Sequence, residues 1–306
     1  MKKISIIGCG RVGETTALVI AQEGLCQEIA LLDVREGAAA GAALDIRQST
    51  AYFGFDVIIT GDDKPEVIRD SDLVIVTAGS PRKPGMSRSD VLDINRRIID
   101  SVVDEVLEYS PDAMLLMVSN PVDVLTWHAW KRTGWNRSRI FGQAGVLDAA
   151  RMASYISMET GCSVRDIHTL VIGGHGDSMM PMFRYSSING IPATTFLDEE
   201  AIRHISERTC NGGAEILALR KTTSAYNAPA AAIATMVDAI SHNRRRILPC
   251  ICALEGEYQQ NDITIGVPAV LGREGIERII ELELNETEQE SFQFSLESIR
   301  ADINRL

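Results

Sequence analysis

A glycine-rich loop between an apolar run and a helical segment is the feature that most constrains the fold of this chain. The loop, residues 8–13 (Gly-Cys-Gly-Arg-Val-Gly), follows the apolar run Lys3–Ile7 and leads into the amphipathic segment Glu14–Glu23. The acidic residue Asp33 lies near the end of the next apolar run, 20 positions after the last glycine of the loop. This spacing, between a strand and a helix, is the fingerprint of a dinucleotide site. The alternative is a glycine-rich turn that binds no ligand.

The three glycines and the acidic residue have distinct expected roles. Gly8 permits a tight turn, Gly10 lets the backbone approach a pyrophosphate, and Gly13 lets the helix pack close to the strand. The start of that helix offers free N–H groups and a partial positive charge to phosphates. Asp33 would accept hydrogen bonds from ribose hydroxyls and would repel a 2′-phosphate. We therefore expect NAD rather than NADP.

Further apolar runs of strand length follow in the first half of the chain. Glu28–Val34, Asp72–Ala78 and Ala113–Ser119 show little alternation with polar residues. Continuous apolar runs suit strands that are buried on both faces of a parallel sheet. Their alternation with helical segments indicates a doubly wound α/β domain. We therefore predict a Rossmann-type doubly wound parallel sheet over residues 1–143.

The second half has a different pattern, which predicts an α+β domain over residues 144–306. A strand is expected at Ile167–Ile172, and an antiparallel pair at Arg246–Leu254 and Asp262–Val270. The expected helices are Asp148–Thr160, Leu197–Leu219, Ala228–His242 and Glu286–Arg305.

Local signals refine the ends of these helices. Asp148 is the expected N-cap of its helix, and the pair Gly212–Gly213 is expected to interrupt the next one. Asn285, followed three residues later by Glu288, predicts a capping box at the start of the last helix.

Composition excludes several classes of protein. The chain of 306 residues carries a net charge of −12, which argues against nucleic-acid binding. Its six cysteines show no C-x-x-C spacing, so we expect reduced thiols and no metal site. No apolar run approaches the roughly 18 residues that span a bilayer. Met1–Gly8 does not resemble a signal peptide, and we expect a cytoplasmic protein without a membrane partner.

A histidine among glycines is the strongest candidate for acid/base chemistry. His175 lies in Gly-Gly-His-Gly-Asp after an expected strand, where it should be exposed at a loop. Asp148 and Arg151, three positions apart, share one helix face and form either part of a site or a local ion pair. Structural or solvent roles are expected for the other four histidines, which are His128, His168, His204 and His242.

Two further segments follow expected strands. Residues 78–88 form a loop rich in proline, glycine and cations, either a solvated loop or a lid with anion-binding arginines. Val118-Ser119-Asn120-Pro121 ends another strand. Ligands bind at the carboxyl ends of strands in open α/β sheets, so these segments should converge with the glycine loop.

Taken together, these motifs identify a resemblance to the lactate/malate dehydrogenase family, and within it to the lactate-dehydrogenase-like malate dehydrogenases. The resemblance covers nearly the whole chain and implies a Rossmann domain followed by an α+β catalytic domain. Its motifs, in order, are the glycine loop, Asp33, Arg82 to Arg88, Val118–Pro121, Asp148-x-x-Arg151 and Gly-His175-Gly-Asp.

The resemblance implies a role for each matching residue. His175 corresponds to the catalytic acid/base and Asp148 to the carboxylate that orients it. Arg151 corresponds to the clamp on the first carboxylate of the substrate, and Arg88 to the arginine that polarises the reacting carbonyl. Arg82 occupies the discriminating position, where malate enzymes carry arginine and lactate enzymes usually glutamine.

The resemblance also implies the cofactor contacts. Asn120 corresponds to a residue that touches both substrate and cofactor. The expected NAD contacts are Gly8, Cys9, Gly10, Arg11, Val12, Gly13, Asp33, Asn95, Val118, Ser119 and Asn120. Two positions depart from the family pattern: Asn227 replaces a frequent aromatic residue, and Gln143 replaces a usual methionine.

The expected function is the NAD-dependent, reversible oxidation of malate to oxaloacetate by a homodimer or homotetramer. One alternative is a lactate dehydrogenase, against which Arg82 argues. Another is a non-catalytic NADH-binding protein on the same fold, which would have no need for the pair of His175 and Asp148.

Overall fold

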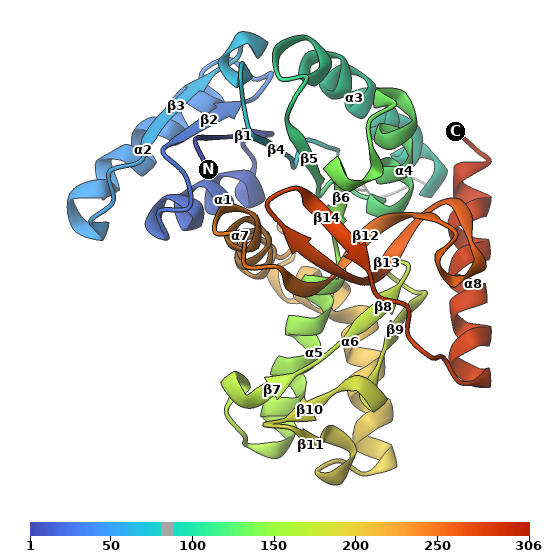
Figure 1. Ribbon diagram of the computed structural model, residues 1–306. Coiled ribbons are helices and arrows are strands. Elements are labelled where there is room, and N and C mark those ends of the chain that lie inside the picture. Colours follow the sequence, from blue (N-terminus) through green and yellow to red (C-terminus); the bar gives the residue numbers. More distant parts are fainter. Residues whose placement is uncertain (81–87) are drawn as a thin grey trace.

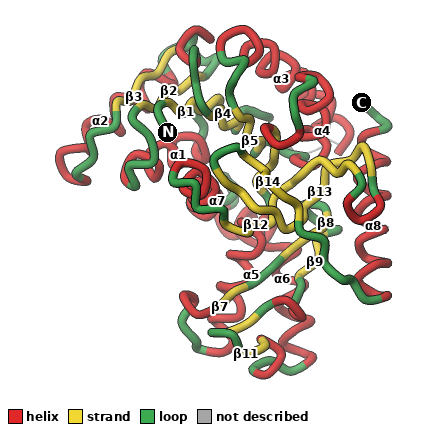
Figure 2. Tube along the Cα trace, in the orientation of Figure 1, coloured by secondary structure: helices red, strands yellow, loops and turns green. Residues whose placement is uncertain are grey.

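The computed structural model describes the backbone of residues 1–80 and 88–306, and the side chains of residues 1–80 and 90–306. The strands of one long sheet run through the molecule between flanking helices, and a few short strands lie in a lower lobe (Figures 1 and 2). The helices are α1 (Arg11–Gln22), α2 (Ala38–Phe53), α3 (Arg88–Tyr109), α4 (Val122–Thr133), α5 (Gly145–Thr160), α6 (Glu199–Arg220), α7 (Asn227–Ser241) and α8 (Glu286–Ile303).

The first half forms a parallel sheet in the order β3-β2-β1-β4-β5-β6. This is the order of two βαβαβ halves that meet between β1 and β4, and it confirms the predicted Rossmann-type fold. The strands are β1 (Lys3–Ile7), β2 (Glu28–Leu32), β3 (Ile58–Asp62), β4 (Leu73–Val76), β5 (Met114–Met117) and β6 (Ile140–Gln143). β1, β4 and β5 are almost entirely buried, as continuous apolar runs require.

The same sheet continues into the second half through antiparallel strands. β12 pairs with β6, and β13, β8 and β9 follow in order, with β14 paired to β13. A small separate sheet has the order β11-β10-β7. These strands are β7 (Ile167–His168), β8 (Val171–Gly173), β9 (Met179–Pro181), β10 (Ser187–Ile188), β11 (Ile191–Pro192), β12 (Arg246–Glu255), β13 (Asn261–Gly272) and β14 (Gly275–Ile279).

Helix packing divides the interior into two apolar clusters. The larger one surrounds the long sheet and includes side chains of both halves, because β12 and β13 extend the sheet that begins with β1. The smaller one lies between α5, α6 and the short strands of the lower lobe in Figure 1. Among residues 1–80 and 88–306, no helix is both long and apolar enough to cross a membrane.

Three local expectations for the second half were wrong. α5 begins at Gly145 with Ala144 as its cap, and Asp148 lies inside the first turn, where its carboxylate contacts Arg151 on the same helix and the distant His175. α6 runs unbroken through Gly212–Gly213, which makes room for a neighbouring side chain. The single strand expected at Ile167–Ile172 is two short strands, β7 and β8, in different sheets.

Two other expectations were confirmed. β12 and β13 form the predicted antiparallel pair. The capping box of α8 is present, with Glu288 N–H donating to the Asn285 side chain and Asn285 N–H donating to the Glu288 carboxylate.

Candidate active site

The glycine loop has the geometry that a dinucleotide cradle requires. Gly8 has a φ of +102°, and a Cβ there would lie 2.6 Å from the backbone nitrogen of Ala78. A Cβ on Gly13 would collide with the carbonyl oxygen of Gly8. At Gly10 a Cβ would meet nothing within 4 Å, so the start of α1 faces open space. The loop is thus tight on the protein side and open on the side where phosphates would bind, and it fits NAD.

Asp33 lies beside this loop and is ionised. Its carboxylate accepts hydrogen bonds from Cys9 N–H (2.7 Å) and from the Arg35 guanidinium. Burial by itself would raise the pKa of Asp33, but the hydrogen bonds from Arg35 and Cys9 hold the pKa below its usual value. The contact with Arg35 was not anticipated from the sequence, although an arginine two residues after the acid was a visible signal.

Polar side chains join the strand ends near the loop. Asn95 is buried, accepts a hydrogen bond from Ser80 N–H (2.7 Å) and donates to the carbonyl of Asn120 (2.6 Å). Ser119 donates to the carbonyl of Ala78 (2.5 Å). The carboxyl ends of β4 and β5 are therefore tied to α3, as the convergence predicted from the sequence requires.

A cavity of about 470 Å³ lies where these segments meet the second half of the chain. Arg11 does not line it; its guanidinium lies over the ring of Tyr226, 5.5 Å from the ring centre. The expected site residues that line the cavity are Val12, Asn95, Val118, Ser119, Asn120, Arg151 and His175. Cofactor-side and substrate-side candidates thus share one space.

His175, Asp148 and Arg151 form a connected cluster at this cavity. His175 Nδ1 and Asp148 Oδ2 lie 2.8 Å apart, and Arg151 Nη1 lies 3.0 Å from Asp148 Oδ1. Asp148 is only 1% exposed, whereas the His175 side chain is 20% exposed. The buried carboxylate thus holds both side chains, and the imidazole retains an accessible edge.

The pKa of His175 reflects two opposing influences. Burial would lower it, but the charge of Asp148 and the hydrogen bond to Asp148 outweigh burial and raise the pKa above its ordinary value. Asp123 adds to this rise. The proton on His175 is therefore held in a pH range above that of a free histidine.

Gly212 on α6 fixes the space around Arg151. A Cβ at Gly212 would lie 3.0 Å from Arg151 Cδ, so a larger residue there would require the arginine side chain to shift. Arg151 Nε is buried and has no hydrogen-bond partner within the described part of the chain. The guanidinium therefore retains donor capacity for a ligand such as a carboxylate.

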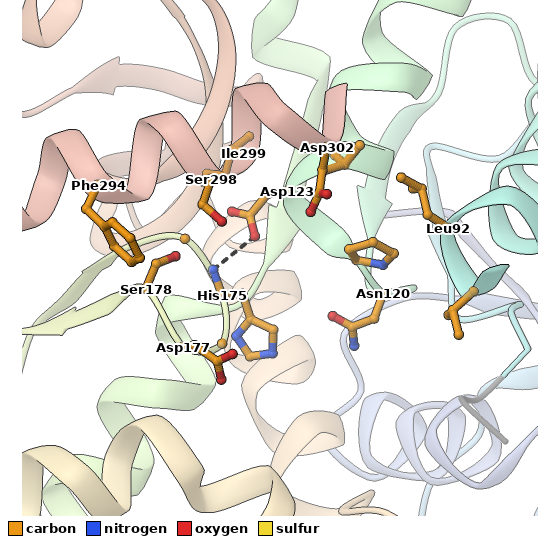
Figure 3. Close-up of a pocket in the computed structure, with 15 residues that line it drawn as sticks. Leu92, Asn120, Asp123, His175, Asp177, Ser178, Phe294, Ser298, Ile299 and Asp302 are labelled. Atoms are coloured by element: carbon orange, nitrogen blue, oxygen red, sulfur yellow. Dashed lines mark hydrogen bonds between the residues drawn. The ribbon is translucent and has the colours of Figure 1, made fainter. Parts of the chain in front are cut away.

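Asp123 is a buried residue of the site that sequence reasoning missed. The backbone N–H of His175 donates to Asp123 Oδ2 over 2.9 Å, and Figure 3 shows the histidine ring extending away from that carboxylate. Burial raises the pKa of Asp123 to about 6, although His175 opposes the rise. Its other oxygen is buried without a partner among the described residues. The signal available was its position three residues after Asn120 in the strand-end motif.

A second cavity, of about 450 Å³, lies on the side of His175 that faces α8 (Figure 3). Its lining includes Asn120, Asp123, Ser298 and Asp302. Val91, Asn120 and His175 line both cavities, so the two cavities adjoin at these residues.

Arg82 lies outside the described residues, and Arg88 begins α3 but its side chain lies outside the described part. Gln143 is buried at the first cavity, with its amide nitrogen unpartnered among the described side chains. Asn227 is the first residue of α7. No cluster of His, Cys, Asp or Glu suited to a metal ion occurs within residues 1–80 and 88–306.

Relatives of known name match this chain over its full length. The malate dehydrogenase of Thioalkalivibrio sulfidiphilus is 61% identical over 306 residues, which is 100% of both chains. That of Nitrosococcus oceani is 59% identical and covers 100% of this chain and 98% of its own.

Solved structures with the same fold include enzymes of two names. The crystal structure of Cryptosporidium parvum malate dehydrogenase has a TM-score of 0.96 and 37% identity, covering 99% of this chain and 98% of its own. The lactate dehydrogenase of the same organism, with lactic acid and nicotinamide adenine dinucleotide bound, has a TM-score of 0.95 and 34% identity, covering 99% and 97%. Backbone similarity therefore does not distinguish the two.

Two family models together cover nearly every residue. Residues 2–142 match the lactate/malate dehydrogenase NAD binding domain, and residues 145–306 match the lactate/malate dehydrogenase alpha/beta C-terminal domain. With the relatives above, these matches show that the chain is an NAD-dependent oxidoreductase that belongs to the lactate/malate dehydrogenase family.

Proposed function

We propose that this enzyme catalyses the reversible oxidation of (S)-malate to oxaloacetate by hydride transfer to NAD. The observation that carries the proposal is the cluster of His175, Asp148 and Arg151 at the cavity beside the glycine loop. The name malate dehydrogenase of the relatives that are 61% and 59% identical supports the choice of substrate.

His175 acts as the acid/base group. Its Nδ1 is engaged by Asp148, which leaves Nε2 for the substrate hydroxyl. In the oxidation Nε2 takes the hydroxyl proton, and in the reduction the protonated ring returns it to the carbonyl oxygen. Proton transfer of this kind contributes about 10²–10⁴ in rate. NAD, when bound, supplies the hydride acceptor.

Arg151 positions the substrate. Its guanidinium would hold the carboxylate next to the reacting carbon through two parallel hydrogen bonds, beside the histidine with which it shares Asp148. Such a clamp fixes the orientation of the C–H bond relative to the cofactor. Asn120 lies at the boundary between the two sets of residues and would touch both ligands.

The cofactor would contact the glycine loop, Asp33 and the ends of β4 and β5. The residues assigned to it are Gly8, Cys9, Gly10, Arg11, Val12, Gly13, Asp33, Asn95, Val118, Ser119 and Asn120. The open side of Gly10 and the ionised state of Asp33 support this assignment.

Arg82 and Arg88 complete the substrate site by resemblance to the family. Arg88 would polarise the reacting carbonyl, and Arg82 would pair with the second carboxylate of a dicarboxylic acid. With pyruvate, Arg82 would remain buried without a partner, which costs several kcal/mol and gives a discrimination of about 10³ or more.

Lactate oxidation is the second candidate, because a lactate dehydrogenase shares the fold with a TM-score of 0.95. The test is NADH consumption with oxaloacetate and with pyruvate, each analysed as kcat/KM. We expect oxaloacetate to be favoured by about 10³ or more. A preference for pyruvate would reject the malate assignment. Arg82→Gln should shift the ratio toward pyruvate, and unchanged selectivity would reject the role of Arg82.

The domain boundary and the assembly are also proposals. We place the boundary between residues 143 and 144, supported by family models that end at 142 and begin at 145. We propose a cytoplasmic homodimer or homotetramer by analogy with the family, which size-exclusion chromatography with light scattering would test.

A further inference from the structure

We propose that Arg35 is a cofactor-specificity residue that weakens the discrimination of Asp33 against a 2′-phosphate, so that the ribose site accepts NADP(H) as well as NAD(H). The inference rests on the proposed placement of the adenosine ribose at Asp33.

The contacts of Asp33 carry this inference. Oδ1 accepts hydrogen bonds from the Arg35 backbone N–H (3.0 Å) and from Arg35 Nε (2.9 Å). Oδ2 accepts from Cys9 N–H (2.7 Å) and from Arg35 Nη2 (3.0 Å). Both oxygens of the carboxylate that should bind the ribose therefore already accept hydrogen bonds, and the Arg35 guanidinium donates to both of them.

The same guanidinium is tied to the phosphate loop. Arg35 Nη2 also donates to the carbonyl of Cys9 over 2.9 Å, so it bridges the ribose acid and the glycine loop. The Arg35 side chain is 65% exposed, whereas that of Asp33 is 9% exposed. Arg35 therefore lies on the solvent side of the carboxylate, where a ligand would approach.

The charges of Asp33 and Arg35 explain why Arg35 would alter the preference between NAD and NADP. Asp33 alone rejects NADP because a carboxylate repels a phosphate dianion at the ribose 2′ position. Arg35 neutralises that carboxylate and presents a planar set of donors that binds phosphate through paired hydrogen bonds. Glu14 also faces Arg35 and retains some negative charge nearby, so NAD(H) should remain the better ligand.

NAD(H) and NADP(H) should differ in whether a contact with Arg35 contributes to their binding. Ribose hydroxyls compete with Arg35 for the oxygens of Asp33, so NAD(H) gains nothing from the guanidinium. A 2′-phosphate instead gains a charge-assisted contact of roughly 1.5–3 kcal/mol, equivalent to about 10- to 100-fold in Kd.

The test measures binding without turnover. Kd values for NADH and NADPH are obtained by fluorescence titration, and those for AMP and adenosine 2′,5′-bisphosphate by calorimetry. Arg35→Gln should raise the NADPH/NADH ratio of Kd by about tenfold or more, through weaker NADPH binding. Arg35→Lys should retain part of the effect, because it keeps the charge without the planar donors. Arg165→Gln, an exposed charge removal on the second half of the chain, is the matched control.

The outcomes separate this inference from the proposed ribose site. An unchanged NADPH/NADH ratio of Kd in Arg35→Gln overturns the role of Arg35. An equal loss of affinity for both cofactors leaves that ratio unchanged and would indicate a contact with the adenine that both share. A ratio above about 10³ in the unaltered enzyme also overturns it, since Asp33 would then reject the phosphate despite Arg35. Asp33→Asn tests the ribose site itself: it should weaken NADH binding, and an unchanged NADH Kd would reject the placement of the ribose at Asp33.

Discussion

Replacing Asp148 with asparagine tests the chemistry of the site most directly, because the substitution removes a charge and keeps the shape of the side chain. Asp148 is 1% exposed and its Oδ2 lies 2.8 Å from His175 Nδ1. A hydrogen bond to a charged group contributes about 1.5–3 kcal/mol, and one pKa unit corresponds to 1.36 kcal/mol. Asp148→Asn removes this contribution, so the pKa of His175 should fall.

The direction follows from what remains around the imidazole. Without Asp148, burial and the positive charge of Arg151 both lower the pKa of His175, and the contribution of Asp123 is too small to compensate. Reduction of oxaloacetate requires the protonated ring, so its rate at neutral pH should fall. The asparagine amide can also donate to Nδ1 and leave the proton on Nε2, which removes the base for malate oxidation. Together these changes should cost about 10²–10⁴ in kcat.

The assay combines two readouts. The pKa of His175 is followed by NMR of the labelled imidazole, and kcat/KM is measured against pH in both directions. The matched control is Asp100→Asn, which alters a similar pair, His128 Nε2 and Asp100 Oδ1 at 2.7 Å, outside both site cavities. It should leave the pH profile unchanged. A His175 pKa that stays the same in Asp148→Asn would refute the reasoning.

The remaining predictions concern three other positions. His175→Asn should abolish turnover and spare NADH binding measured by fluorescence; full turnover would reject its role. Gly212→Ala should displace Arg151 and lower kcat/KM for oxaloacetate about tenfold. Gly213→Ala, whose Cβ would lie 3.7 Å from Arg151 Nη2, should leave kcat/KM nearly unchanged. Equal losses of kcat/KM in the two variants would contradict the proposed role of Gly212. Because the folded-state pKa of Asp123 is raised from 3.8 to about 6, its ionisation destabilises the fold as pH rises through that window. Between pH 3 and pH 7, the free energy of unfolding of Asp123→Asn, measured with urea, should therefore rise by up to about 3 kcal/mol relative to that of the unaltered protein. A relative fall in the free energy of unfolding over that range would contradict the assignment.

Local patterns in the sequence determined the fold class and predicted most of the residues proposed for catalysis. The continuous apolar runs predicted buried parallel strands because both faces of such strands exclude water. The glycine loop and Asp33 predicted the dinucleotide cradle, since tight backbone approach and an acid at a fixed distance are local requirements. His175 stood out because its glycine neighbours mark exposed, closely packed backbone.

Only the tertiary structure decided how these residues are connected. Asp148 looked like a helix cap from its sequence neighbours, yet its carboxylate is bound to His175, 27 residues away. The glycines at 212–213 looked like a helix break because glycine has low helix propensity, yet the helix continues since one of them accommodates Arg151. The sequence predicted that the carboxylate of Asp33 would be free to bind a ribose, yet in the folded protein it accepts hydrogen bonds from the Arg35 guanidinium. Periodicity and spacing report which face of an element is apolar and which residues are near in the chain. They do not report which elements pack against each other, and the hydrogen bonds, burial and pKa values of this site depend on that packing.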